Sequence, residues 1–276
     1  MLGYRHIFHA GNHADILKHA VLTLTLQALL RKDKPFVYID THAGPGRYAL
    51  DDVRALRTGE FQDGIGRWWP PAASVPALAP LLSIVHDLNP EGTLRHYPGS
   101  PHIAQRLLRP ADRLVLMELH PADHQALHLA FGGSAAVKVE RGDAFERLKA
   151  YLPPPERRGM VFIDPPYELK SDYSRVVELL VDAHRRWATG MYLLWFPVLS
   201  RLAAQRFVER IAATGIPRQL CLEYLPHEAG AGVNLQGSGM VIINPPFKLD
   251  VDLAALALGL GESVPGRCRL RWTVPE

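Results

Sequence analysis

The residues best suited to chemistry stand at positions 164–167, which read Asp-Pro-Pro-Tyr after the apolar run 160–163. Such a run predicts a buried strand, which delivers the polar segment at its carboxyl end. Two prolines remove backbone donors and fix φ, so the turn is rigid. The Asp164 carboxylate and the Pro165 carbonyl can accept the two N–H groups of a planar amine, and Tyr167 can stack on a base. Such a site is suited to holding an amine in line with a methyl donor.

Acidic residues also follow two earlier predicted strands. Glu118 follows the apolar run 114–117, where a carboxylate can accept both ribose hydroxyls of an adenosine-type ligand. Asp143 follows the third predicted strand, where it can reach the amine of the ligand's adenine or cap the helix that begins at Ala144. The alternatives are a solvated carboxylate at Glu118 and an ordinary proline turn at 164–167. Because the acids follow successive predicted strands in order along the chain, we favour ligand binding over these alternatives.

A turn rich in small residues follows the first predicted strand, at 36–39. Residues 40–46 read Asp-Thr-His-Ala-Gly-Pro-Gly, and small residues let the backbone approach a ligand. His42 stands where the usual Gly-x-Gly-x-x-Gly pattern has its first glycine, so this segment alone also fits a simple tight turn. Glu118 lies much farther from the turn than the usual spacing of about twenty residues. This spacing indicates an insertion between them.

A second proline motif stands near the end of the chain. Residues 244–247 read Asn-Pro-Pro-Phe, and asparagine can also accept a hydrogen bond from an amine. Chain order argues against this motif as the primary site, because residues 248–276 are too few for the helix and strands that should follow. We expect it to end a late strand near the sheet edge, where proline is tolerated.

The segment before the first strand concentrates aromatic and basic side chains: Tyr4, Arg5, His6, Phe8, His9, His13, Lys18 and His19. Its histidines match no familiar zinc spacing, so we expect no metal site. RNA contact fits better, with cations for phosphates and aromatic rings for stacking. We predict that Tyr4, His6 and Lys18 face RNA, Lys18 at a phosphate. The alternative is a solvated amphipathic arm.

The elements that position these residues alternate between strands and helices, which predicts a mostly parallel, doubly wound α/β sheet. Strands are predicted at 36–39, 114–117, 136–139, 160–163, 191–195, 219–222, 240–243 and 270–274. Helices are predicted at 12–32, from Ser100 to 108, at 172–189 and at 201–214. Residues 51–96 lack a strand pattern, so we predict an inserted, largely helical subdomain there. A long surface excursion without its own core is the alternative.

The bulk composition sets broad limits. The formal net charge is +3 with two cysteines, so an anionic partner is permitted and no disulfide framework is expected. The chain has no signal-peptide pattern and no apolar run of membrane-spanning length. We therefore expect a soluble, cytoplasmic protein with no membrane partner.

These motifs together resemble the bacterial 23S ribosomal RNA adenine N6-methyltransferases of the large-subunit J type. The resemblance spans nearly the whole chain and is most specific in its N-terminal block. It rests on residues 4–6, 8–15, 40–44, 97–101, 118–121, 164–168 and 237–240.

The resemblance implies a Rossmann-like class I methyltransferase domain formed by residues 1–50 and 97–276. Residues 1–35 would be its N-terminal arm and helix, and 51–96 its inserted helical subdomain. It implies S-adenosylmethionine as the cofactor, Asp164 as the catalytic residue and Tyr4 near the target base. The residues implied to bind the cofactor are His19, His42, Ser100, Glu118, Asp143, Ala144 and Asp164, and Ala144 stands where the family has glycine.

We therefore expect N6-methylation of a specific adenine in 23S ribosomal RNA, either free or partly assembled, with no obligate protein partner. A DNA adenine methyltransferase would use the same chemistry, and a protein glutamine amide presents a similar planar amine. A non-catalytic ribosomal RNA-binding assembly factor could also keep this fold. The N-terminal resemblance favours RNA, and the intact segment 164–167 argues against a factor without activity.

Overall fold

The computed structural model describes residues 3–70, 75–226, 235–263 and 266–275. Its strands are β1 (Val37–Asp40), β2 (Arg47–Ala49), β3 (His96–Pro98), β4 (Arg113–Glu118), β5 (Val137–Arg141), β6 (Gly159–Ile163), β7 (Met191–Val198), β8 (Gln219–Leu225), β9 (Gly237–Ile243) and β10 (Arg267–Val274). Its α-helices are α1 (His13–Leu30), α2 (Val53–Thr58), α3 (Glu60–Asp63), α4 (Ala79–Leu88), α5 (Ser100–Leu107), α6 (Pro121–Phe131), α7 (Ala144–Arg147), α8 (Asp172–Arg186), α9 (Arg201–Ala212) and α10 (Leu249–Ser263). Short 3-10 helices are η1 (His6–Phe8), η2 (Ile65–Trp68), η3 (Pro76–Leu78) and η4 (Leu148–Tyr151).

Eight strands form one sheet in the order β10-β8-β9-β7-β6-β1-β4-β5. The half from β5 to β7 is parallel, and β9, β8 and β10 add antiparallel strands. Asp40 is in register with Leu116 and Phe162, so β1, β4 and β6 end at the same edge. The chain turns one way from β1 to β4 and β5, and the other way to β6 and β7. Ligands of doubly wound folds bind at such a switch point, beyond the carboxyl ends of the strands.

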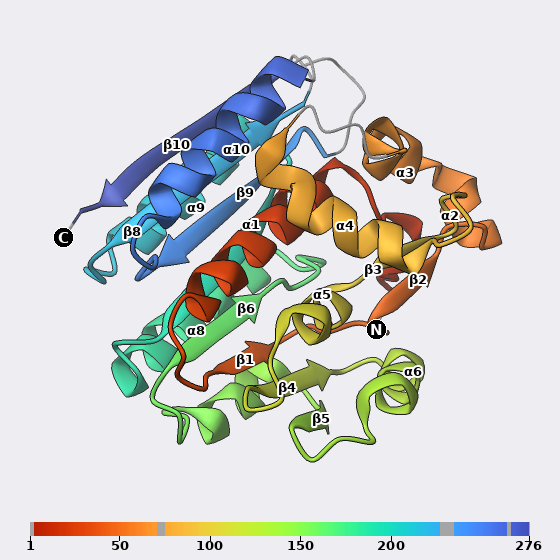
Figure 1. Cartoon of the computed structure of the whole chain (residues 1–276). Coiled ribbons are helices and arrows are strands. Elements are labelled where there is room, and N and C mark those ends of the chain that lie inside the picture. Colours follow the sequence, from red (N-terminus) through yellow and green to blue (C-terminus); the bar gives the residue numbers. More distant parts are fainter. Residues whose placement is uncertain (1–2, 71–74, 227–234, 264–265, 276) are drawn as a thin grey trace.

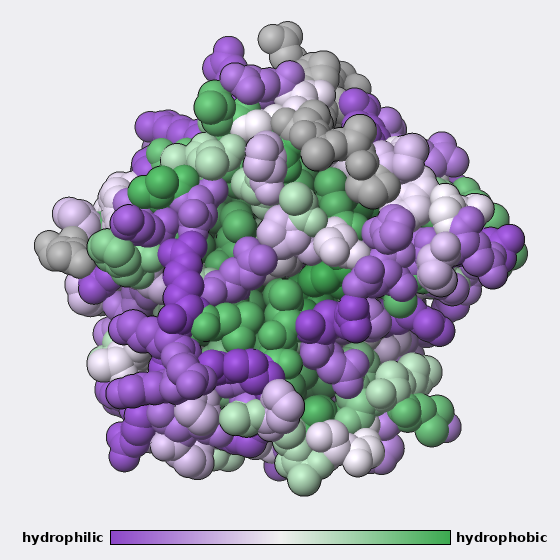
Figure 2. All heavy atoms as spheres, in the orientation of Figure 1, coloured by the Kyte–Doolittle hydropathy of each residue, from purple (hydrophilic) through white to green (hydrophobic). Residues whose placement is uncertain are grey.

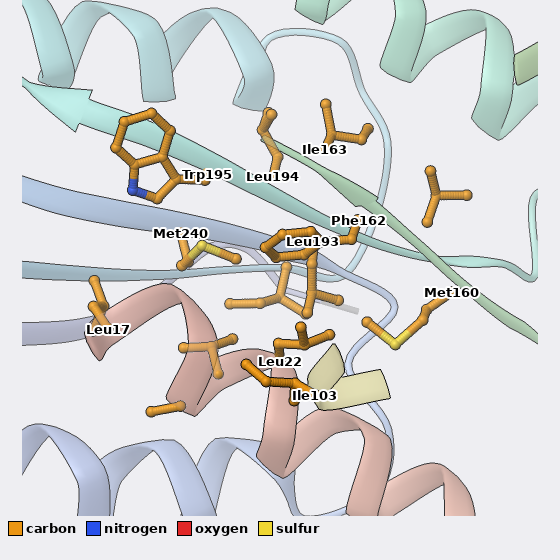
Figure 3. Packing of buried hydrophobic residues seen from close by; sticks show 14 of the residues in the cluster. Leu17, Leu22, Ile103, Met160, Phe162, Ile163, Leu193, Leu194, Trp195 and Met240 are labelled. Carbon is orange, nitrogen blue, oxygen red and sulfur yellow. The ribbon is translucent and has the colours of Figure 1, made fainter. Parts of the chain in front are cut away.

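Helices cover both faces of the sheet (Figure 1): α1 and α10 pack on one face and α9 on the other. Figure 2 shows hydrophobic residues gathered toward the centre of one face, with hydrophilic residues around them. Helix α1 is apolar around its circumference, as expected for a buried helix. Figure 3 shows its Leu17 and Leu22 close to sheet residues such as Leu193 and Met240. Asn12 caps the helix by accepting hydrogen bonds from two backbone N–H groups.

The predicted strands and helices agree closely with the structure, but several elements were not predicted. These are helices α6 and α10 and strands β2 and β3. Strand β9 lies between β8 and β7, so the expectation that residues 244–247 follow a strand near the sheet edge was wrong. The prolines fit because they come after the last residue of β9, where no ladder hydrogen bond is required.

Within its described residues, the segment 51–96 contains α2, α3, α4, two short 3-10 helices and the start of β3, and β2 pairs with β3 at its base. Leu81, Leu82 and Val85 of α4 belong to the same hydrophobic cluster as the sheet residues. The segment therefore shares the core of the main sheet, and its standing as a separate subdomain stays a prediction. Residues 71–74 lie outside the described residues. Within the described ranges, no helix is long and apolar enough to cross a membrane.

Candidate active site

A cavity of about 370 Å³ opens at the switch point of the sheet, within the size range of ligand pockets. It is lined by the turn after β1 and by residues that follow β4, β5 and β6. The N-terminal segment and α1 contribute further lining residues. The cavity thus brings together all but one of the predicted site residues: Tyr4, His6, Lys18, His19, His42, Ser100, Glu118, Asp143, Ala144, Asp164 and Pro165.

Asp164 is held from the side of α1. The Lys18 ammonium donates to Asp164 Oδ2 at 2.6 Å and lies 2.9 Å from Asp15 Oδ1. Burial alone lowers the pKa of Lys18, but the carboxylates of Asp15 and Asp164 outweigh it and hold that pKa above its ordinary value. Lys18 is therefore a permanent cation that fixes one oxygen of Asp164 and leaves the other free to accept a hydrogen bond.

Lys18 is 3% exposed, so it does not offer the surface phosphate contact predicted for it. The prediction required the side of the helix that carries Lys18 to face RNA. Helix α1 is instead buried on nearly all sides, and Lys18 also lies 5.2 Å from the centre of the Trp195 ring. Its charge serves the interior of the site.

The N-terminal segment forms one wall of the cavity. The Tyr4 hydroxyl is 2.8 Å from His6 Nδ1, and the His6 Nε2 atom is 3.0 Å from Asp15 Oδ2. The Tyr4 ring stacks on His9 with ring centres 5.7 Å apart. The segment is therefore tied by side chains to α1 and is not a solvated extension.

Glu118 closes the turn after β1. One carboxylate oxygen accepts from the Gly44 N–H at 2.8 Å and the other from the His120 N–H at 2.6 Å. Burial raises the pKa of Glu118. Each oxygen keeps a further lone pair for a ligand hydroxyl. Gly44 has φ +61° and a Cβ there would lie 2.5 Å from the Tyr48 hydroxyl oxygen, so the turn needs glycine.

Asp143 already has two partners. It caps α7 through the Phe145 N–H and pairs with Arg175 of α8 at 2.8 Å. The Arg175 guanidinium also lies 4.0 Å from the centre of the Phe145 ring. Next to them, burial lowers the pKa of His42 to about 4, so its imidazole is neutral. This part of the cavity therefore combines the Asp143 carboxylate with the rings of His42 and Phe145.

The opposite end combines neutral hydrogen-bonding groups. His19 Nδ1 is 2.9 Å from the Tyr97 hydroxyl, and burial lowers the pKa of His19 to about 3. The Ser100 hydroxyl donates to Asp40 at 2.6 Å. Burial raises the pKa of Asp40 to about 6. The hydroxyl groups of Ser100 and Tyr38 stabilise its charged form and act in the opposite direction, but burial has the larger effect.

Tyr167 is the predicted site residue that does not line the cavity. Its φ is +51°, its hydroxyl donates to the Trp195 carbonyl, and its ring packs against Tyr173 and Phe207. The ring is buried, so in this structure it is not placed to stack on a base. The prediction treated the motif as one surface, whereas the chain reverses at Tyr167 and turns the ring into the core.

Several lining residues escaped the sequence analysis, and two of them contribute large side chains to the site. Trp195 of β7 and Arg175 of α8 both line the cavity. An aromatic residue in the strand beside β6 was a usable signal for Trp195. No local pattern marks Arg175, because its role depends on the contact between α7 and α8.

Asn244 lies away from the cavity. Strand β9 is antiparallel to β7, and Ile243 pairs with Tyr192 near the start of β7. Asn244 therefore stands beyond the amino ends of the parallel strands, where its amide donates to the carbonyls of Ala188 and Gly190.

A family model described as "Ribosomal RNA large subunit methyltransferase D, RlmJ" matches residues 33–274. The chain belongs to this family. It is 46% identical over the full length of both chains to "Ribosomal RNA large subunit methyltransferase J" of Escherichia coli. It is 43% identical, again over both full lengths, to the protein of the same name from Haemophilus influenzae.

Two solved structures share the fold of this chain. A crystal structure of a protein from Legionella pneumophila matches 95% of this chain and 97% of its own, with 34% identity and a TM-score of 0.86. A probable spermidine synthase from Corynebacterium glutamicum matches 91% of this chain and 73% of its own, with 15% identity and a TM-score of 0.50, and so shares the fold.

As a methyltransferase of the RlmJ family, the protein uses S-adenosylmethionine. The cavity fits this molecule chemically. Glu118 offers acceptors for a ribose, Asp143 and the neighbouring rings suit an adenine, and Asp164 places negative charge near a sulfonium. His19 and Ser100 add neutral polar groups.

Proposed function

We propose that this protein methylates the exocyclic N6 amine of one adenine in 23S ribosomal RNA. The names of the relatives support a large-subunit ribosomal RNA as the substrate. One observation carries the choice of an amine: Asp164, followed by rigid Pro165, lines the cavity with one oxygen fixed by Lys18. Two acceptors at the end of a buried strand match the two N–H groups of an adenine amine.

The reaction is a displacement in which a C–N bond forms as a C–S bond breaks. The bound cofactor supplies a methyl group on a positively charged sulfur. Adenine N6 is a weak nucleophile because its lone pair is conjugated with the ring. Asp164 and the Pro165 carbonyl accept its two N–H bonds, favour a pyramidal nitrogen and stabilise the positive charge that develops on it. Once methylated, the positively charged nitrogen is acidic and gives one proton to the Asp164 carboxylate, which releases it to water.

The cofactor is held by groups already described. Glu118 binds the ribose hydroxyls, and Asp143 with Ala144 binds the adenine beside His42. We assign His19 to the carboxylate of the methionine part of S-adenosylmethionine. If the Tyr97 hydroxyl donates to His19 Nδ1, the other ring nitrogen of His19 carries the proton and can donate to that carboxylate. The Ser100 oxygen keeps lone pairs that can accept from the amino group of the methionine part of the cofactor.

The RNA base enters beside the N-terminal wall. It must leave its stack at a cost of a few kcal/mol, unless the RNA already exposes it. Tyr4 and Trp195 are the cavity-lining aromatic residues on the side of α1, and we assign base contact to Tyr4 with His6 supporting its hydroxyl. This arrangement replaces the stacking role predicted for Tyr167.

The test uses unmodified 23S ribosomal RNA transcribed in vitro, with DNA and protein fractions as competitors. The full chain with tritiated S-adenosylmethionine should label the RNA, and nucleoside mass spectrometry should find N6-methyladenosine. Label confined to DNA or protein, or methylation at another atom, would overturn the proposal.

The variant Asp164→Asn separates chemistry from binding. We expect turnover to fall at least about 100-fold, because a group that stabilises developing charge is lost. Calorimetry should give a cofactor affinity close to that of the unaltered protein. Turnover within a few-fold of normal would remove Asp164 from the catalytic role.

A further inference from the structure

A second concave surface lies far from the methyl-transfer cavity along the sheet. It runs between α9 and the outer strands β8 and β10, and Figure 1 shows β10 at the edge of the sheet. We call it the arginine groove, defined by Arg201, Arg267, Arg269 and Arg271. Nothing in the proposed chemistry uses these residues.

The arrangement of the arginines follows from strand geometry. Positions 267, 269 and 271 alternate along β10, so their side chains project from the same face of the sheet. Successive arginines are therefore about 6.8 Å apart along the strand. Arg201 faces them from the first turn of α9. The result is a row of cations rather than a scattered group.

The positive charge of the groove is only half compensated by its own carboxylates. Arg201, Arg267 and Arg269 are exposed and have no ion-pair partner among the described residues. Arg271 is anchored by Glu223 at 2.6 Å. Glu209, also in the lining, accepts from the Gln205 amide. Four arginines against two glutamates leave two net positive charges, and a row of exposed cations attracts a polyanion.

The groove begins at the same edge of the sheet as the cavity. Arg267 pairs with Leu225, the last residue of β8, and β8 runs in the same direction as β7. Four inter-strand steps of about 4.8 Å separate β6 from β10, or about 19 Å along the sheet. A nucleic acid strand that leaves the cavity needs only a few nucleotides to reach Arg267.

We propose that the arginine groove binds the sugar–phosphate backbone of the substrate RNA next to the nucleotide that is methylated. The proposal rests on the proposed function for its partner, and charge complementarity decides the occupant. Arginine forks bind phosphate oxygens with two hydrogen bonds.

The test compares the double variant Arg267→Ala, Arg269→Ala with the unaltered full chain. Filter binding to unmodified 23S ribosomal RNA is measured without cofactor, at about 50 to 200 mM salt. Two lost phosphate contacts should lower the salt slope by about 2 and the affinity at least about tenfold near 0.1 M salt. Because both side chains are exposed and unpaired, cofactor affinity and thermal stability should not change.

The matched control is Arg185→Ala, Arg186→Ala, which removes the same charge from the C-terminal turn of α8. Both of these arginines pair with Asp182, and they lie toward the amino ends of the parallel strands. We expect the control to bind RNA like the unaltered protein. If the groove variant does the same, or if both doubles lose affinity equally, the groove does not bind RNA.

The two proposals fail in distinguishable ways. An unaltered protein that binds 23S ribosomal RNA but does not methylate it contradicts the proposed function and leaves the groove measurable. Normal methylation with unchanged RNA affinity and salt slope in the groove variant contradicts the groove alone.

Discussion

At the scale of single residues, the site depends on charges that are buried and paired. An ammonium group as buried as Lys18 is stable only with a carboxylate partner, and it has two, Asp15 and Asp164. The pKa of Asp15 lies well below its ordinary value, because His6 and Lys18 outweigh the effect of burial. Asp15 and Lys18 therefore keep their charges at neutral pH.

Glu118 offers a test of cofactor binding. In Glu118→Gln one oxygen becomes an NH₂ group, which then meets a backbone N–H at Gly44 or His120. We expect S-adenosylmethionine affinity to fall about tenfold or more, as charge-assisted hydrogen bonds to the ribose weaken. Calorimetry measures it, with exposed Glu91→Gln as the control. An unchanged affinity would mean that Glu118 only closes the turn after β1 and does not bind the ribose.

Asp40 predicts how stability depends on pH. Its carboxyl is fully buried and its pKa is raised to about 6, so the folded state binds its proton more tightly than the unfolded state does. Its contribution to the free energy of unfolding is complete below about pH 4 and is lost as pH rises through about 6. Asp40→Asn removes this titration while keeping the shape of the side chain.

Urea unfolding of both proteins at about pH 4 and about pH 7 measures the effect. The stability of Asp40→Asn relative to the unaltered protein should increase over that interval. A constant difference would mean that Asp40 titrates normally in the folded chain.

At the scale of elements, α1 is the part of the fold on which the site most depends. Leu22 is fully buried against the sheet, whereas Leu258 of α10 is 63% exposed. Leu22→Ala should lower the free energy of unfolding by about 2–5 kcal/mol. The control Leu258→Ala should stay within about 0.5 kcal/mol. Equal effects in urea unfolding would show that α1 is not packed as described.

The strands that carry the site could be predicted because each is a run of buried apolar residues. Glu118 and Asp164 follow such runs directly, and parallel strands in a doubly wound sheet end at one edge. The strand predictions and their order along the chain were therefore enough to predict that Glu118 and Asp164 lie at the same edge of the sheet. Helix α10 was missed because its apolar residues do not follow a clear helical stripe.

Directions of side chains could not be predicted in the same way. Tyr167 turns inward because its φ is positive and because its ring packs against Tyr173 and Phe207. These two residues lie on α8 and α9, outside the turn. Lys18 is buried because it packs against Asp164 and the Trp195 ring, and neither contact leaves a mark near Lys18 in the sequence. Both errors concern non-local packing.

At the scale of the whole molecule, the segment 51–96 supports the site through the N-terminal wall. Glu60 binds His9 and Asn12, each at 2.9 Å, and His9 stacks on Tyr4. The Ile65 N–H also donates to the Gly11 carbonyl. The helices of this segment thus fix the position of a residue that we assign to the target base.

Glu60→Ala should therefore lower methyl transfer at saturating cofactor by roughly tenfold, since small displacements at a reacting centre are costly. Cofactor affinity should remain normal, because Glu60 does not line the cavity. Glu91→Ala, an exposed carboxylate in the same segment, should leave both quantities unchanged. Equal rates in the two variants would mean that the segment does not position the wall.

The direction of β9 has a consequence for how proteins of this kind are recognised in genomes. A signature that accepts Asn or Asp before Pro-Pro and an aromatic residue scores this chain twice, at 164–167 and at 244–247. Because β9 is antiparallel to β7, the second match lies at the opposite pole of the sheet from the first. A pattern search that also asks whether the preceding strand is parallel to its neighbours would reject such false positives and avoid counting a second active site.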